Sequence, residues 1–389
     1  MGKKIKKFIS FYKPWITNEE IKEVEKVIRS GWLTMGPKVL EFEEKFRKYI
    51  GAKYAIAVNS CTAGLFLSLV SLGIGKDHEV ITTVFSFAST ANTIVHTGAK
   101  PVFVDISRDT FNIDPSAIEK VINKRTKAIV VVHYGGRPCQ MDKILKIARK
   151  YHLKVIEDCA HAPGAEYKNK KVGTFGDTAS FSFYATKNLT TGEGGMITTN
   201  NKKLADRLRI LRLHGISKDA WKRYSKGGEW YYEIIEAGFK YNMTDIQAAL
   251  GLVQLKKLDY LNEIRRRQAR YLMENLKNVP EIQLPIIGGR VKNVWHLFPI
   301  LIRPERMSID RDKFIKELNR YNIGTSVHFI PFHLHPFYRK RFGYKKGDFP
   351  NAEYVYNRII SLPFYPKMRR EDYDYVVRAI KSIIKKYKK

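Results

Sequence analysis

The sequence of 389 residues has few cysteines and no long apolar run. Its three cysteines, Cys61, Cys139 and Cys159, have spacings that fit no zinc or redox motif, and an odd number does not suit a disulfide framework. The longest apolar runs, such as AIVVV at 128–132, are far too short to cross a bilayer. A signal peptide has an apolar segment after its basic N-terminus, and this sequence has none there. These absences predict a cytoplasmic protein with free thiols, no structural metal and no membrane insertion.

Acidic residues are scarce relative to basic ones. Asp and Glu number 38 against 70 Lys and Arg, which gives a formal net charge of +32. Such a balance suits a nucleic acid, an anionic membrane surface or an anionic small substrate. The excess is dispersed apart from short lysine runs at the two ends, GKKIKK and KKYKK, and no zinc finger or RRM signature accompanies it. A solvated lysine-rich surface is therefore the simplest explanation, and a nucleic-acid or anionic-surface binder stays an open alternative.

Short β-branched runs alternate with amphipathic stretches between about residues 50 and 200. Several of these runs are apolar throughout, which is typical of strands buried on both faces of a sheet. The pattern predicts an α/β fold with a mostly parallel seven-stranded sheet covered by helices, in which ligands bind beyond the carboxyl ends of the strands. The predicted strands are 53–59, 79–83, 100–106, 127–133, 154–158, 178–183 and 195–199, and helices are predicted at 62–73, 87–98 and 141–151.

The alternation stops near residue 200, and a long helical periodicity covers 245–276. We expect a large α/β domain over 1–250, which includes an N-terminal arm. A smaller C-terminal α+β domain over 251–389 would begin with the long linking helix. The other elements predicted in it are a strand at 295–302, a helix from Asp310, a strand near 324–329 and a basic helix from 371.

Polar side chains stand where three of the predicted strands end. Ser60 and Thr62 lie where one strand runs directly into a helix, and the free N–H groups of such a helix start bind anions, although an ordinary helix cap explains Ser60 equally well. Glu157 and Asp158 close another strand, where a carboxylate serves either active-site chemistry or a cap. Lys187 follows a third strand and precedes a loop with three glycines. A lysine exposed to solvent needs no such position.

An anion site, a carboxylate and an amine at one edge of one sheet are what pyridoxal 5'-phosphate requires. The phosphate needs the helix N-terminus, the pyridine nitrogen needs a carboxylate, and the aldehyde needs an amine. Phe87, at the start of a predicted helix, could stack on the ring, although a core position is the more common role for such a residue. The combination predicts a pyridoxal-phosphate enzyme.

Three segments carry a resemblance to a known family: NSCTAGLFLSL from residue 59, VIEDCAHAPGAEYKNKKVGTFGDTASFSFYATKNLTTGEGGMITT from 155, and KYNMTDIQAALGLVQLKKLD from 240. They resemble the sugar-nucleotide aminotransferases of the DegT/DnrJ/EryC1/StrS family, and the similarity covers nearly the whole chain. Within that family, VVHYGGRP, HGISKDAW and WHLFPI are most similar to the members that form UDP-4-amino-4-deoxy-L-arabinose.

The resemblance implies a fold-type-I pyridoxal-phosphate transferase that works as a homodimer with shared active sites. By position, Lys187 would be the Schiff-base lysine and proton carrier, and Asp158 would pair with the ring nitrogen. The other implied cofactor contacts are Ser60, Cys61, Thr62 and Ser182 at the phosphate, Phe87 on the ring face, His161 near the ring hydroxyl, and Asn242 from the partner chain. Cys61 stands where Gly or Ala is usual, and Phe87 stands where the most similar members have Trp.

Two further residues are implied in substrate binding. Thr34 would border the sugar pocket, although a surface turn is an equal alternative. His328 would lie near the nucleotide phosphates, although His333 or His335 nearby are as readily structural. The expected activity is transfer of the amino group of L-glutamate to the keto carbon, C4, of a UDP-linked ketosugar for cell-envelope or glycan biosynthesis. A sugar dehydratase of the same family is an alternative, but such members replace the lysine with histidine.

Overall fold

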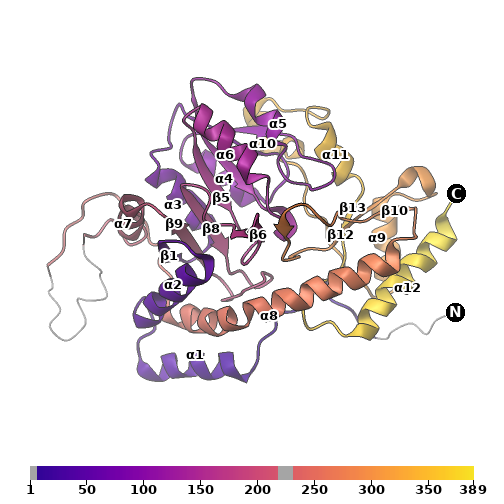
Figure 1. Ribbon diagram of the computed structural model, residues 1–389, viewed down its shortest axis with the longest axis horizontal. Coiled ribbons are helices and arrows are strands. Elements are labelled where there is room, and N and C mark those ends of the chain that lie inside the picture. Colours follow the sequence, from indigo (N-terminus) through magenta and orange to yellow (C-terminus); the bar gives the residue numbers. More distant parts are fainter. Residues whose placement is uncertain (1–6, 218–230) are drawn as a thin grey trace.

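The computed structural model describes residues 7–217 and 231–389 (Figure 1). Most of the N-terminal GKKIKK run and the KDAW end of the motif HGISKDAW lie outside the described residues. Among the described residues, no helix has the length and apolar character needed to cross a bilayer.

A seven-stranded sheet forms the centre of the larger part of the molecule, as the sequence predicts. Four neighbouring pairs are parallel, and β9 runs antiparallel to both β8 and β1. In sheet order the strands are β1 (Tyr54–Val58), β9 (Gly195–Thr199), β8 (Thr178–Ser182), β5 (Lys154–Asp158), β4 (Thr126–Val132), β2 (Glu79–Thr83) and β3 (Lys100–Val104).

Helices cover both faces of this sheet because its strands are apolar on both sides. Val80 of β2 packs in a cluster with α3 and α4, whereas its neighbour Ile81 packs in a cluster with α6. Successive strand residues point to opposite faces, so each face needs its own helical cover. The helices of this part are α3 (Cys61–Ser71), α4 (Ala88–His96), α5 (Pro115–Ile118), α6 (Met141–Lys150) and α7 (Lys202–Leu211).

The long helix α8 (Asp245–Leu276) runs along the base of the molecule and joins its two parts (Figure 1). Thr244 caps it by accepting a hydrogen bond from the Gln247 N–H at 3.3 Å. Its first half packs with α2 (Pro37–Ile50) and β8, and α1 (Asn18–Ser30) lies along it; its second half packs in the C-terminal core. We propose that α8 links two domains, and the expected boundary at residue 250 then falls inside this helix.

The C-terminal part contains the three-stranded sheet β10-β12-β13. The N-terminal arm packs against this part. Ile9 forms a parallel bridge with Ile323 and belongs to the C-terminal core. The elements of this part are β10 (Ile282–Gln283), β12 (Pro299–Ile302), β13 (Ile359–Ser361), α9 (Arg311–Arg320), α10 (Pro336–Phe342), α11 (Pro350–Tyr356) and α12 (Arg370–Tyr387). A small third sheet joins β11 (Val291–Lys292), β6 (Glu166–Tyr167) and β7 (Lys170–Lys171).

Two strand predictions in this part need correction. The strand predicted at 295–302 is confined to β12, because the His296 N–H donates to the Gly135 carbonyl at 2.9 Å instead of to a neighbouring strand. The strand predicted near 324–329 is wrong: only Ser326 forms a single bridge. The chain there leaves the small sheet for the large one, where the Phe332 N–H donates to the Val84 carbonyl just after β2.

Candidate active site

A cavity of ≈ 620 Å³ lies at the carboxyl ends of the parallel strands, between the large sheet and the C-terminal part. Its wall contains nine of the residues that the sequence singled out: Ser60, Cys61, Thr62, Phe87, Asp158, His161, Ser182, Lys187 and His328. All of them except His328 lie at or just after the ends of strands of the large sheet, and these residues converge because parallel strands end at one edge of a sheet. Thr34 and Asn242 do not line the cavity of their own chain.

The turn between β1 and α3 has the form of an anion site. Ser60 is the N-cap of α3, and its Oγ accepts a hydrogen bond from the Ala63 N–H at 3.0 Å. Gly195 packs directly under this turn, where an added Cβ would lie 2.6 Å from the Ser60 carbonyl carbon and 2.7 Å from the Cys61 nitrogen. The Cys61 thiol points to Ser180, with Sγ and Oγ 3.4 Å apart. Close packing from below thus fixes this helix start, whose free backbone N–H groups would bind a phosphate.

Asp158 is a buried carboxylate at the end of β5, 3% exposed. Its Oδ2 accepts a hydrogen bond from the Thr90 hydroxyl at 2.8 Å, and its Oδ1 accepts one from the Ala160 N–H at 3.1 Å. Burial nevertheless raises the pKa of Asp158, because these bonds and the charge of Lys187 only partly offset the loss of solvation. A protonated ring nitrogen would supply the nearby positive charge that this carboxylate needs.

Lys187 lies in the turn after β8 and lines the cavity. Burial lowers the pKa of Lys187 to about 8, and Cys61 and Asp158 oppose part of this shift. The unprotonated amine, which is the nucleophile for a carbonyl, is therefore accessible near neutral pH. Its backbone is fixed as well: the carbonyl of Lys187 accepts a hydrogen bond from the Tyr12 hydroxyl at 3.0 Å.

Two stacked histidines form another part of the cavity wall. The rings of His161 and His296 have centroids 4.3 Å apart and an interplanar angle of 28°. Burial lowers the pKa of each of them well below the usual value for histidine. His328, which comes from the C-terminal part, stacks on Phe11, and its Nδ1 lies 2.9 Å from the Ser361 hydroxyl. Burial lowers the pKa of His328 to about 4. Burial thus favours the neutral form of all three rings.

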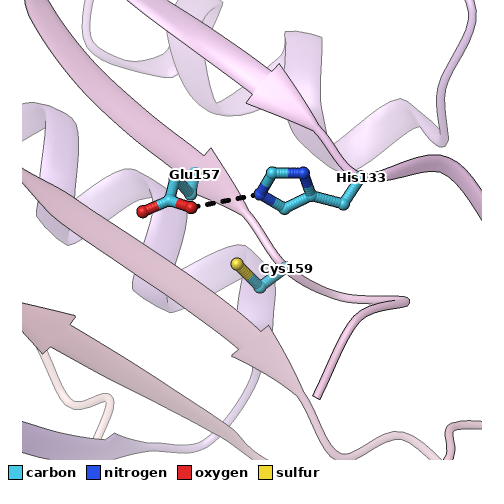
Figure 2. Close-up of side chains that lie close together, drawn as sticks. All are labelled: His133, Glu157 and Cys159. Atoms are coloured by element: carbon cyan, nitrogen blue, oxygen red, sulfur yellow. Dashed lines mark hydrogen bonds and ion pairs between the residues drawn. The ribbon is translucent and has the colours of Figure 1, made fainter. Parts of the chain in front are cut away.

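Glu157, which precedes Asp158, faces away from the cavity and forms a cluster with His133 and Cys159 (Figure 2). Its carboxylate accepts hydrogen bonds from the N–H groups of Gly173, Phe175 and Gly176 at 2.8–2.9 Å. His133 Nε2 lies 3.1 Å from the same carboxylate.

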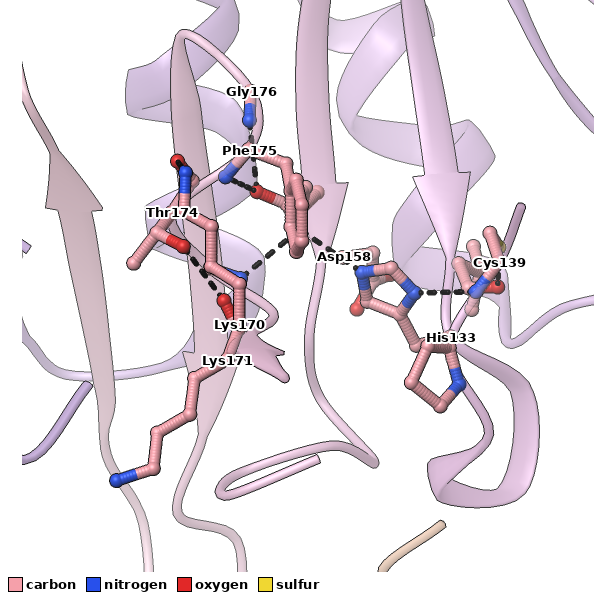
Figure 3. Close-up of polar contacts among 12 residues, drawn as sticks. His133, Cys139, Asp158, Lys170, Lys171, Thr174, Phe175 and Gly176 are labelled. Atoms are coloured by element: carbon pink, nitrogen blue, oxygen red, sulfur yellow. Dashed lines mark hydrogen bonds and ion pairs between the residues drawn. The ribbon is translucent and has the colours of Figure 1, made fainter. Parts of the chain in front are cut away.

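The Nδ1 atom of His133 accepts a hydrogen bond from the Cys139 N–H at 3.1 Å (Figure 3), so Nε2 carries the proton that is donated to Glu157. Burial raises the pKa of Glu157, but its hydrogen bonds from His133 and the backbone outweigh this and lower it overall. Hydrogen bonds thus account for this cluster, which anchors the 173–176 turn beside β5, and we assign it no metal.

The predicted site residues Thr34 and Asn242 lie outside this cavity. Thr34 is exposed in the loop between α1 and α2, where its carbonyl accepts a hydrogen bond from the Asp245 N–H at 3.1 Å. Asn242 forms a bridge with Val58 at the end of β1, and its Oδ1 accepts a hydrogen bond from the Lys240 amine at 2.5 Å. A structural role for His333 also has support. Its Nε2 lies 2.8 Å from the Glu353 carboxylate, and His333 does not line the cavity.

The cavity also contains residues that the sequence did not single out. Tyr12, His296 and Phe329 all line it, and Thr90 supports Asp158 from behind. His296 belongs to the segment WHLFPI, whose similarity to relatives was the only available signal. Tyr12 has no such signal, because it reaches the cavity from the N-terminal arm, and Phe329 directly follows His328, which only the resemblance to the family singles out.

The residues of this cavity fit pyridoxal phosphate. A nucleophilic amine, a carboxylate that lacks a full cationic partner and a helix N-terminus packed on a glycine lie at one sheet edge, as that cofactor requires. Fold and site together define a pyridoxal-phosphate-dependent aminotransferase of fold type I.

Comparison with known proteins supplies the family. Residues 14–381 match the sequence profile of the DegT/DnrJ/EryC1/StrS aminotransferase family, to which the chain belongs. Uncharacterized protein MJ1066 of Methanocaldococcus jannaschii is 62% identical to this chain, and the aligned region covers 97% of this chain and 98% of that protein. Spore coat polysaccharide biosynthesis protein SpsC of Bacillus subtilis is 50% identical over 99% of both chains.

A solved structure is similar over nearly the same length. The putative sugar aminotransferase Spr1654 from Streptococcus pneumoniae, in its PMP form, superimposes with a TM-score of 0.91 at 33% identity, over 97% of this chain and 99% of that one. The predicted family, fold and cofactor are thereby confirmed.

Proposed function

We propose that the protein transfers the amino group of L-glutamate to the keto carbon, C4, of a nucleotide-linked ketosugar, with UDP as the nucleotide. The observation that carries the proposal is the amine of Lys187 in the cavity wall, since an aminotransferase needs an amine that exchanges protons and a sugar dehydratase of this family has histidine there. The similarity to a spore coat polysaccharide biosynthesis protein and to a putative sugar aminotransferase supports a sugar substrate. The net charge of +32 suits a substrate that carries a pyrophosphate.

Each side chain of the cavity has a distinct task in this reaction. When bound, pyridoxal phosphate supplies a carbonyl for amine exchange and a ring that withdraws electrons. Lys187 would hold the cofactor through its amine and would carry a proton on Nζ. Asp158 would face the ring nitrogen and favour its protonated form, and the start of α3 would bind the phosphate. Phe87, 62% exposed at the mouth, offers its ring for stacking. We further propose a cytoplasmic location, because Cys61, Cys139 and Cys159 are free.

The proposal is tested by incubating the purified protein with L-glutamate and a panel of nucleotide-linked 3-keto and 4-keto sugars. Mass spectrometry should show an amino sugar and 2-oxoglutarate in equal amounts, with UDP-4-ketosugars converted fastest. Loss of water from the sugar without amine gain would instead identify a dehydratase. Faster conversion of a 3-ketosugar, or of a substrate with another nucleotide, would contradict the assignment of C4 or UDP.

We also propose that the protein is a homodimer and that Asn242 contacts the cofactor phosphate of the partner chain. Asn242 does not line the cavity of its own chain, although it lies immediately before α8 and beside the end of β1. A second copy related by a two-fold axis would complete both sites at once.

A mixture of two inactive variants tests the shared site. Asn242→Asp should be inactive because its carboxylate would repel the phosphate, and Lys187→Ala should be inactive because it lacks the amine. Refolded together, the two should regain about a quarter of wild-type activity, since half of the dimers formed at random are mixed and each mixed dimer has one intact site. If mixed dimers form, as shown by two affinity tags, and activity stays absent, Asn242 does not act in trans.

A further inference from the structure

The residue after the reactive lysine, Asn188, joins three parts of the molecule. Its side chain is 3% exposed. Its Nδ2 donates hydrogen bonds to Oδ1 of Asn262 in α8 at 2.9 Å and to the Val294 carbonyl at 3.0 Å. Its Oδ1 lies 3.1 Å from Nδ1 of His296. Asn188 thereby ties the loop that carries Lys187 to α8 and to the segment before β12.

The far end of this network fixes the direction of each bond. Asn262 faces the Pro163 carbonyl at 3.0 Å, which can only accept, so Asn262 must turn its Nδ2 toward Pro163 and its Oδ1 toward Asn188. The Val294 carbonyl likewise requires a donor. Asn188 therefore presents its Nδ2 to both acceptors and its Oδ1 to His296. His296 must then carry its proton on Nδ1, which leaves Nε2 as an acceptor.

His161, stacked on His296, has the opposite tautomer. Its Nδ1 accepts a hydrogen bond from the Gly135 N–H at 3.3 Å, so its proton is on Nε2. Two stacked rings of the cavity wall, 4.3 Å apart, thus have opposite tautomers: Nε2 is a donor in His161 and an acceptor in His296. In this tautomer, Nε2–H of His161 is the ring's donor for an oxygen of the cofactor or substrate.

The groups that face His296 all oppose its protonation. After burial, which is the largest cause, the nearby cations Lys187 and Arg265 lower its pKa further, and protonation of His161 or His328 would act in the same direction. Arg265 is itself 1% exposed and uses its Nη1 on the carbonyls of Trp295 and Phe364. A neutral side chain beside Nδ1 preserves this state, whereas an anionic one would reverse it.

We propose that Asn188 is a positioning residue: its side-chain amide fixes the Nδ1–H tautomer of His296 and holds the His296–His161 pair in place relative to Lys187. A carboxylate of the same shape fails in two ways. It has no donor for the Val294 carbonyl or for Asn262, and it attracts a second proton to His296. The inference rests on amine chemistry at Lys187 and not on which sugar is aminated.

The variant Asn188→Asp tests this on the cofactor-loaded protein without substrate. We expect its visible absorbance to acquire an ionisation between about pH 6 and 8 that the wild type lacks, because the introduced carboxylate would stabilise a protonated His296. We expect kcat to fall about tenfold or more, with a change of less than about threefold in KM for the amino donor, since geometry and not binding is altered.

Two matched variants isolate the cause. Asn275→Asp adds the same charge near the end of α8, at a residue whose Nδ2 donates to the Tyr271 carbonyl at 2.9 Å, and should leave the titration unchanged. His296→Phe in the Asn188→Asp background keeps an aromatic ring but cannot ionise, so the new ionisation should vanish.

A measurement on the wild type covers the case in which Asn188→Asp does not fold. In protein labelled with ¹⁵N-histidine, and assigned with His296→Phe, Nε2 of His296 should be unprotonated between about pH 6 and 8. A protonated Nε2, a folded Asn188→Asp without the ionisation, or an ionisation that persists without His296 would overturn the proposal. Failure of the sugar panel alone would overturn only the proposed substrate.

Discussion

Lys187→Ala is expected to abolish amino transfer while the protein still binds its cofactor. The variant keeps the start of α3, Asp158 and the ring platform, so the phosphate and ring contacts persist. It lacks the amine that forms the covalent bond and moves the proton, and we expect kcat to fall by more than about four orders of magnitude. Rates with L-glutamate and the ketosugar, together with the visible spectrum of the loaded variant, measure both effects.

Peptide mapping identifies the lysine directly. Borohydride reduction of the wild-type protein should place the pyridoxyl group on Lys187. Lys171 serves as the matched control, because burial also lowers its pKa, yet its Nζ donates to the Tyr49 carbonyl and it does not line the cavity. Lys171→Ala should keep both the label and the activity. A label on another lysine, or appreciable turnover by Lys187→Ala, would contradict the assignment.

The large sheet and most of the cavity could be predicted because they depend on local pattern and one topological rule. Neighbouring strand residues such as Val80 and Ile81 are both apolar and point to opposite faces of the sheet. Both faces must therefore be covered by helices. Once the strands are parallel, their carboxyl ends share an edge. Residues as far apart in the sequence as Ser60, Asp158 and Lys187 must then meet there.

The rest depends on tertiary contacts that leave no local signal. Tyr12 reaches the carbonyl of Lys187 across 175 positions of the sequence, and His296 reaches the cavity because its segment binds to the Gly135 turn. The segment near 324–329 reads as a strand but crosses to the end of β2, where Phe332 finds its backbone partner. Tyr12, His296 and Phe329 thus escape prediction from local pattern. His328, which comes from the same C-terminal part as His296 and Phe329, is predicted only through the resemblance to the family.

Asp158→Asn is expected to keep the fold and to lower kcat by about three orders of magnitude or more. The amide has the shape of the carboxylate, and its oxygen can still accept the hydrogen bond from the Ala160 N–H that Asp158 accepts at 3.1 Å. It cannot balance the charge of a protonated ring nitrogen, and a neutral pyridine is a poor electron sink. Single-turnover rates and thermal unfolding of the loaded variant separate the two consequences.

The neighbouring carboxylate provides the control. Glu157 is equally buried and also carried by β5, but it faces away from the cavity and binds the N–H groups of Gly173, Phe175 and Gly176. Glu157→Gln sets an amide nitrogen against these donors, so it should lower the melting temperature while the folded enzyme keeps its turnover. Asp158→Asn should do the reverse. If Asp158→Asn instead loses stability and keeps near-normal turnover, its carboxylate is a structural cap, and the ring nitrogen must find its partner elsewhere.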